Sequence, residues 1–92
     1  MSTVRIPPVL RAQAGGAKTI DLAGATVGGV LDALVAAHPG LRAQLFTDDG
    51  TLNRFVNVYV DGQDVRYTGD LATEVGEHDE VVILPAMAGG AG

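Results

Sequence analysis

Polar and apolar side chains alternate along residues 3–7 and again along residues 18–22. A period of two is typical of a half-buried strand, because successive side chains of a strand point to opposite faces. Pro7 and Pro8 end the first segment, and Gly15 and Gly16 mark a turn before the second. The pattern therefore predicts two strands that pair as a hairpin at the N-terminal end.

Residues 26–38 change to a helical period. Apolar side chains recur at intervals of three and four residues and form one stripe, made of Val27, Val30, Leu31, Leu34 and Val35. Thr26 is a suitable N-cap, and Pro39 with Gly40 ends the helix. Gly28 and Gly29 weaken the first turn by roughly 1 kcal/mol each relative to alanine. We expect them where the helix packs closely on the sheet.

The next segments predict a short helical turn over residues 41–46, a polar loop over 47–53 and a clear strand over 55–60. The strand places Val56, Val58 and Val60 on one face, and Phe55, Asn57 and Tyr59 on the other. Asp61-Gly62 is the usual chemistry of a tight hairpin turn. We expect it to lead into a short strand over residues 65–67.

The last strand is predicted over residues 80–84, after a turn-rich segment, residues 69–79, with one apolar anchor at Leu71. Four consecutive apolar residues are typical of a central strand that is covered on both faces. The predicted order is β-β-α-β-β-β, an α+β fold of the β-grasp, or ubiquitin-like, arrangement. It implies a mixed sheet of about five strands with one main helix packed on one face. We expect a single domain over residues 1–85 and a flexible tail over 86–92.

Composition narrows the classes of partner. The 92 residues are 47% hydrophobic and 18% charged, which is typical of a folded domain. The net charge of −5 argues against nucleic acid and anionic membranes, and it favours a partner with a basic docking surface. Cysteine is absent, and His38 and His78 are far apart, so we expect no metal site. The chain has neither a signal peptide nor a membrane-spanning run, and we expect a cytoplasmic protein.

The tail after Pro85 reads Ala-Met-Ala-Gly-Gly-Ala-Gly. Glycine has no Cβ atom, so a Gly-Gly segment can lie extended in a slot that is too narrow for side chains. The tail has no reactive side chain, which leaves the terminal carboxylate as the leading candidate for the reactive group. The rest of the chain then serves to present this carboxylate to a partner.

Two segments carry a resemblance to a known family. Residues 55–66 resemble the central hairpin of the ubiquitin-like sulfur carriers of the MoaD/ThiS family, and residues 79–90 are most similar to its CysO-type branch. The similarity covers nearly the whole chain. It implies that a partner, an E1-like activating enzyme, consumes ATP to adenylate the C-terminal glycine. A sulfur donor then converts the adenylate to a thiocarboxylate, and a synthase accepts the sulfur for cysteine or another metabolite. The resemblance implies a monomeric carrier that binds no cofactor and is not an enzyme.

The chain departs from the family pattern at its end, because Ala91-Gly92 follows the Gly-Gly pair. Two extra residues would shift the reactive end by roughly 6–7 Å, at about 3.3 Å per extended residue. We expect a zinc-dependent protease of the JAMM type to remove them, so that Gly90 becomes the adenylation site and Ala88 with Gly89 is recognised beside it. The alternative is that Gly92 is activated directly.

Docking is predicted on the sheet face that carries Phe55, Asn57 and Tyr59, since exposed aromatics are common interface anchors. The alternative is that they are ordinary surface aromatics. Arg5, Arg54 and Arg66 are expected to be solvated, and the alternative is that they form salt bridges with acidic residues of the activating enzyme. Two other function classes stay open. One is a ubiquitin-like modifier that is conjugated to target lysines, and the other is a plain binding module whose tail has no role.

Overall fold

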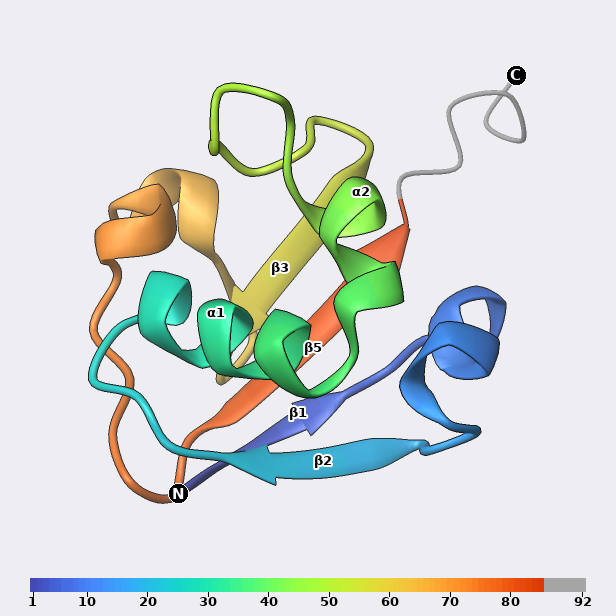
Figure 1. Ribbon diagram of the computed structural model, residues 1–92. Helices are drawn as coiled ribbons and strands as arrows, with labels where there is room; N and C mark the ends of the chain where they lie inside the picture. Colours follow the sequence, from blue (N-terminus) through green and yellow to red (C-terminus); the bar gives the residue numbers. More distant parts are fainter. Residues whose placement is uncertain (86–92) are drawn as a thin grey trace.

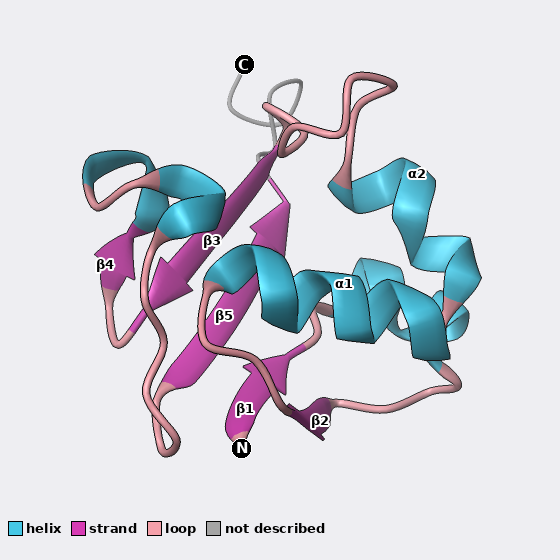
Figure 2. Cartoon of the chain, turned by 60° about the vertical axis from the view of Figure 1, so that its left-hand side comes forward, coloured by secondary structure: helices cyan, strands magenta, loops and turns pink. Residues whose placement is uncertain are grey.

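Five strands and two α-helices make up the computed structural model, which describes residues 1–85. The helices are α1 (Val27–Ala37) and α2 (Arg42–Leu45), and the strands are β1 (Ser2–Arg5), β2 (Thr19–Leu22), β3 (Val56–Val60), β4 (Gln63–Asp64) and β5 (Glu80–Pro85). Short 3₁₀ segments join them (Figure 2): η1 (Pro8–Ala14), η2 (Pro39–Leu41), η3 (Val65–Tyr67) and η4 (Asp70–Ala72). None of the helices in this part of the chain is long and apolar enough to cross a membrane.

The strands form one mixed sheet in the order β2-β1-β5-β3-β4. β1 runs parallel to β5 with Val4 opposite Val81, and the other neighbouring strands are antiparallel. β5 is therefore central, and α1 crosses one face of the sheet (Figure 1). This arrangement confirms the predicted β-grasp fold.

The core lies between α1 and the sheet. Thr26 caps α1 as predicted, since its side chain accepts a hydrogen bond from the Gly29 N–H at 3.1 Å. The apolar stripe of the helix is fully buried, together with the alternate valines of β3. The same cluster includes Val4, Ile6, Leu41, Leu45, Val65, Val81 and Ile83.

The prediction that β5 is covered on both faces is wrong. Val81 and Ile83 are buried, but Val82 is half-buried and the Leu84 side chain is 45% exposed. α1 and α2 lie on one face of the sheet (Figure 1), and Val81 and Ile83 belong to the same buried cluster as the apolar side chains of these helices. An apolar run thus indicated the central position of the strand, whereas its outer side chains face away from the helices.

The hairpin after β3 has the predicted turn but not the predicted second strand. Asp61 and Gly62 have φ angles of 49° and 88°, the left-handed pair of a type I′ turn. β4 then ends at Asp64, whose carboxylate accepts the Arg66 N–H at 2.9 Å and caps η3. Residues 65–67 are therefore a 3₁₀ turn that buries Val65, and not a strand.

Three further details differ from the sequence-based expectation. η1 is helical where only a break was predicted, because Leu10 and Ala14 turn into the core. Val75 is a second buried anchor in the turn-rich segment. Gly28 packs against η4 and not the sheet, since a Cβ atom there would lie 3.1 Å from the carbonyl oxygen of Leu71.

Candidate functional site: the C-terminal end of β5

The candidate site is the end of β5 from which the tail continues. Pro85 pairs with Val56, and Leu84 pairs with Asn57, so the neighbouring strand holds the base of the tail in register. The predicted reactive and recognition residues, Ala88, Gly89, Gly90 and Gly92, lie outside the described residues. Their roles stay predictions, and the described residues define the surface from which they project.

On the outer face of the sheet, the pairing brings the predicted docking residues to Leu84. Tyr59 pairs with Val82 and Asn57 with Leu84 on β5. The side chains of Asn57, Tyr59 and Val82 are half-buried. We call Asn57, Tyr59, Val82 and Leu84 the outer patch. Leu84 was missed as a surface residue, although its alternation with Val81 and Ile83 was a signal that could have placed it there.

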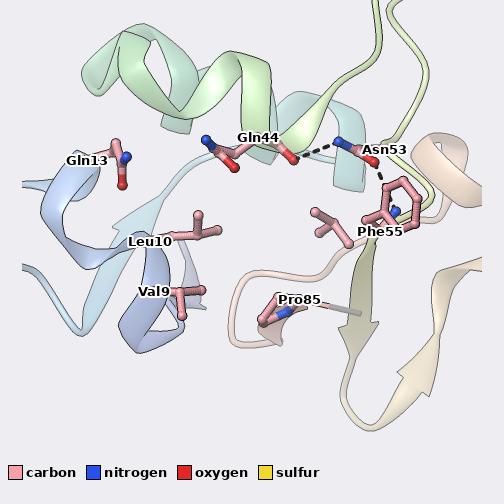
Figure 3. A pocket seen from close by; sticks show the side chains of 8 residues that line it. Val9, Leu10, Gln13, Gln44, Asn53, Phe55 and Pro85 are labelled. Carbon is pink, nitrogen blue, oxygen red and sulfur yellow. Dashed lines mark hydrogen bonds between the residues drawn. The ribbon is translucent and has the colours of Figure 1, made fainter. Parts of the chain in front are cut away.

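Phe55 lies apart from the outer patch. It precedes β3, its N–H donates to the Asn53 side-chain oxygen at 2.9 Å, and the residue is 54% exposed. Its ring borders a pocket of about 260 Å³ between η1, α2 and the end of β5 (Figure 3). The pocket is lined by Val9, Leu10, Gln13, Gln44, Asn53, Phe55, Val56 and Pro85. Phe55 therefore offers its exposed ring beside the base of the tail.

Two of the three arginines that were expected to be solvated are engaged. Arg5 forms an ion pair with Glu80 at 2.5 Å, and this carboxylate raises the pKa of the Arg5 guanidinium. Arg66 bonds to the Asn57 side-chain oxygen and to the carbonyl oxygens of Arg54 and Val56 at 2.9 and 3.1 Å. The expectation was wrong for Arg5 and Arg66 because β1–β5 pairing and the η3 turn bring acceptors within reach.

The opposite end of β5 is acidic and is built from turns. Asp61 donates its N–H to the Glu80 carbonyl at 3.0 Å and accepts the Glu80 N–H at 2.9 Å on its carboxylate. Asp79 accepts the Gly76 N–H at 2.6 Å. That hydrogen bond holds the pKa of Asp79 below its ordinary value of 3.8. These contacts fix the start of β5 against the hairpin.

The described residues offer surfaces for docking and no evident reactive centre. Residues 1–85 contain no group of three or more histidine, cysteine or acidic side chains that could hold a metal ion. The chemistry that this end of the molecule can support is the presentation of a peptide terminus from a rigid strand.

Comparison with known proteins gives a family. The model of the ThiS family matches residues 4–90. The sulfur carrier protein CysO of Mycobacterium tuberculosis is 46% identical over 90 residues, which cover 96% of this chain and 97% of that protein. Small archaeal modifier protein 1 of Haloferax volcanii is 39% identical over 82 residues, which cover 86% of this chain and 90% of the relative.

Solved structures agree. The structure of a BexX/CysO complex from Amycolatopsis orientalis contains a chain with a TM-score of 0.91 and 44% identity, and the match covers 98% of this chain and all of that one. A crystal structure of small archaeal modifier protein 1 from Haloferax volcanii has a TM-score of 0.76 and 36% identity, over 91% of this chain and 92% of that one. The similarity therefore extends over both sequence and fold.

Proposed function

This chain belongs to the ThiS family, and we infer that it is a sulfur carrier that works through its C-terminal carboxylate. The observation that carries the proposal is the extent of the family match, which reaches from β1 to the Gly-Gly pair of the tail. The name of the mycobacterial relative, a sulfur carrier, supports the same role. The fold adds a physical reason, because β5 is central and holds the base of the tail rigidly.

The proposed chemistry begins with a poor electrophile, since a carboxylate resists nucleophilic attack. Its oxygen attacks the α-phosphorus of ATP on a partner enzyme, which releases pyrophosphate and leaves an acyl-adenylate. A hydrosulfide ion then attacks the carbonyl carbon and expels AMP, which gives the thiocarboxylate. A persulfide donor would instead give an acyl disulfide, which a thiol reduces to the same product. The enzyme supplies these catalytic groups, and the carrier supplies its terminus and a docking surface.

Gly90 is the proposed reactive terminus. The family match ends at this residue, two positions before the end of the chain. Reacting atoms must approach to about 3–3.5 Å, and two additional residues displace the end by roughly 6–7 Å. We therefore assign removal of Ala91 and Gly92 to a protease, of the JAMM zinc type if the resemblance holds, before adenylation.

Docking is proposed on the outer patch together with Phe55. Leu84, Asn57 and Phe55 lie beside the base of the tail, so an enzyme that takes the tail into a narrow channel must cover them. The relative from Amycolatopsis orientalis was solved in a complex with BexX, which supports the formation of a protein complex by such carriers. We propose a cytoplasmic protein that is monomeric when free.

Three chains test the proposal: the full chain, a chain that ends at Gly90 and a control that ends at Ala88. Each is incubated with ATP, sulfide and the activating enzyme from the same genome, and its intact mass is then measured by mass spectrometry. We expect the exchange of one oxygen for sulfur only in the chain that ends at Gly90. Sulfur on the full chain would reject trimming, and sulfur on none of the three would reject the carrier function.

A modifier role is the second candidate, and the identity of 39% with small archaeal modifier protein 1 favours keeping it. The same adenylate would then be attacked by a lysine amine of a target protein, which expels AMP and leaves an isopeptide bond. Trypsin digests of cell extract distinguish the two roles. Lysines that carry a remnant ending in Gly90 support the modifier, whereas a thiocarboxylate without such conjugates supports the carrier.

A further inference from the structure

The charges of the chain separate along β5. The acidic residues Asp61, Asp79 and Glu80 gather at its first residues through the hydrogen bonds described above, and Glu74 borders the same hollow as Asp61 and Asp79. The cationic residues Arg5, Arg11 and Lys18 lie beside its later residues instead, and the Arg5 side chain reaches back to Glu80. Although the net charge is −5, the charges are uneven: one end of β5 is acidic, the other is basic, and the tail continues from the basic end.

Three of the six cations of the chain border a single groove of about 230 Å³ on the outer side of β5. Arg5 comes from β1, Arg11 from η1 and Lys18 from the residue before β2. Val82 and Leu84 contribute the apolar part of the groove, and Leu84 is 45% exposed. The groove thus combines an apolar floor with a cationic border, next to Pro85.

Two of these cations have no acidic partner among the described residues. The ion pairs within residues 1–85 are Arg5–Glu80 and Arg66–Asp64, so neither Arg11 nor Lys18 pairs with a carboxylate there. Arg11 Nε donates to the Ile6 carbonyl at 3.0 Å, which holds its guanidinium at the border of the groove. Lys18 is exposed, and its carbonyl accepts the Ile6 N–H at 2.8 Å, which fixes its backbone.

We propose that this groove docks an acidic segment of the enzyme that takes the tail, with carboxylates at Arg11 and Lys18 and an apolar side chain on Leu84. This inference rests on the proposed function, because it assigns the surface of this chain that the activating enzyme contacts. It revises the expectation of a basic docking surface, which considered only the net charge. An acidic surface near the tail channel attracts the basic end and repels the end that carries Asp61 and Asp79, so the carrier arrives tail first.

The test is direct binding of the full chain to the activating enzyme without ATP, so that no chemistry contributes to the signal. The variants Arg11→Glu and Lys18→Glu, alone and combined, are compared with Arg42→Glu, an exposed site on α2 with the same change of net charge. We expect the double variant to raise Kd about tenfold at low salt, with the difference shrinking as salt screens the charges. Arg42→Glu should stay within about twofold of the parent chain. An equal effect of all reversals, or none, overturns the proposal.

A second measurement does not depend on the enzyme. A synthetic peptide with two leucines among four glutamates is titrated into the full ¹⁵N-labelled chain. Amide shifts at Arg11, Lys18 and Leu84 that vanish in the double variant support the groove, and their absence overturns it. If the peptide binds but the enzyme does not, the choice of enzyme partner fails while the groove stands. If both bind but no sulfur is loaded on the chain that ends at Gly90, only the carrier function fails.

The terminal carboxylate of the chain itself is a competing occupant. Amidation of the C-terminus removes its charge without a change in the fold. If the amidated chain binds the peptide several-fold more tightly, with altered Arg11 and Lys18 shifts before any peptide is added, the groove belongs to the tail and the proposal is overturned. Equal affinity of both chains supports the enzyme as the occupant.

Discussion

Arg66 occupies the position of a neighbouring strand beside Val56: its Nη2 donates to the Val56 carbonyl oxygen at 3.1 Å. The same nitrogen donates to the carbonyl of Arg54 at 2.9 Å. β4 pairs only with Tyr59 and Val60, so this edge of β3 has no strand partner before Tyr59 within residues 1–85. The guanidinium thus satisfies main-chain oxygens at the edge of β3 opposite to β5, the strand from which the tail continues.

Replacement of Arg66 by lysine tests this edge. The lysine ammonium carries its three donors on one nitrogen, so it cannot span the separate acceptors that the two guanidinium nitrogens of Arg66 reach. We expect Arg66→Lys to lower the free energy of unfolding by about 1 kcal/mol, measured by urea denaturation. Arg54→Lys is the control, because the Arg54 carbonyl remains available to Arg66. Equal stability of the two variants would contradict this assignment.

Gly24, which precedes α1, leaves no room for a side chain. A Cβ atom at this position would lie 2.7 Å from the backbone nitrogen of Val30 and 2.8 Å from its Cγ2. Backbone cannot move aside cheaply, so we expect Gly24→Ala to cost about 1–3 kcal/mol of stability. Gly40→Ala is the matched control, since its Cβ would meet only the flexible Gln13 side chain at 3.4 Å. A shift in thermal midpoint confined to the Gly24 variant is the expected result.

Asp79 predicts a pH dependence of stability. Its pKa is lowered in the folded chain, chiefly by the Gly76 N–H. The folded state then binds its proton less readily than the unfolded state, so the stabilisation is present above the unfolded pKa and is lost as pH falls through the folded value. We expect this loss below pH 3.8. Thermal unfolding from pH 2 to 6 measures it.

The control for this pH dependence is Glu77→Gln, which removes a carboxylate from the same turn but leaves the Gly76–Asp79 hydrogen bond in place. Asp79→Asn should flatten the acidic part of the stability profile, and Glu77→Gln should retain it. A profile that flattens equally in both variants would show that the acidic end acts through its total charge.

Replacement of Leu84 should weaken binding to the activating enzyme without lowering the stability of the fold. Its side chain is 45% exposed on the outer patch, so Leu84→Ser should change stability little. We expect the KM for the carrier in ATP–pyrophosphate exchange to rise about tenfold, because the variant lacks an apolar anchor that the complex with the activating enzyme would bury. Tyr67→Ser is the control, because Tyr67 is 88% exposed on η3, outside the outer patch. A rise of KM in the Tyr67 variant alone would place the docking surface elsewhere.

The local elements were readable from the sequence because their determinants are neighbours in the chain. The valine-leucine stripe after Thr26 produced α1, the alternating valines produced β3, and Asp61-Gly62 produced its turn. The order of these elements and the Gly-Gly tail were enough to predict the fold and the family. Residues 65–67 were mistaken for a strand because the Asp64 cap and the burial of Val65 favour a 3₁₀ turn.

Only the tertiary structure decided how distant segments meet around β5. The parallel pairing of β1 with β5 places Arg5 beside Glu80 and, with η1, gathers the basic groove at the base of the tail. The position of α1 on one side of the sheet leaves Leu84 exposed on the other. Periodicity shows which side chains share a face. Whether that face is covered, and which charges gather on it, depends on the distant segments that pack against it, and only the folded chain determines those contacts.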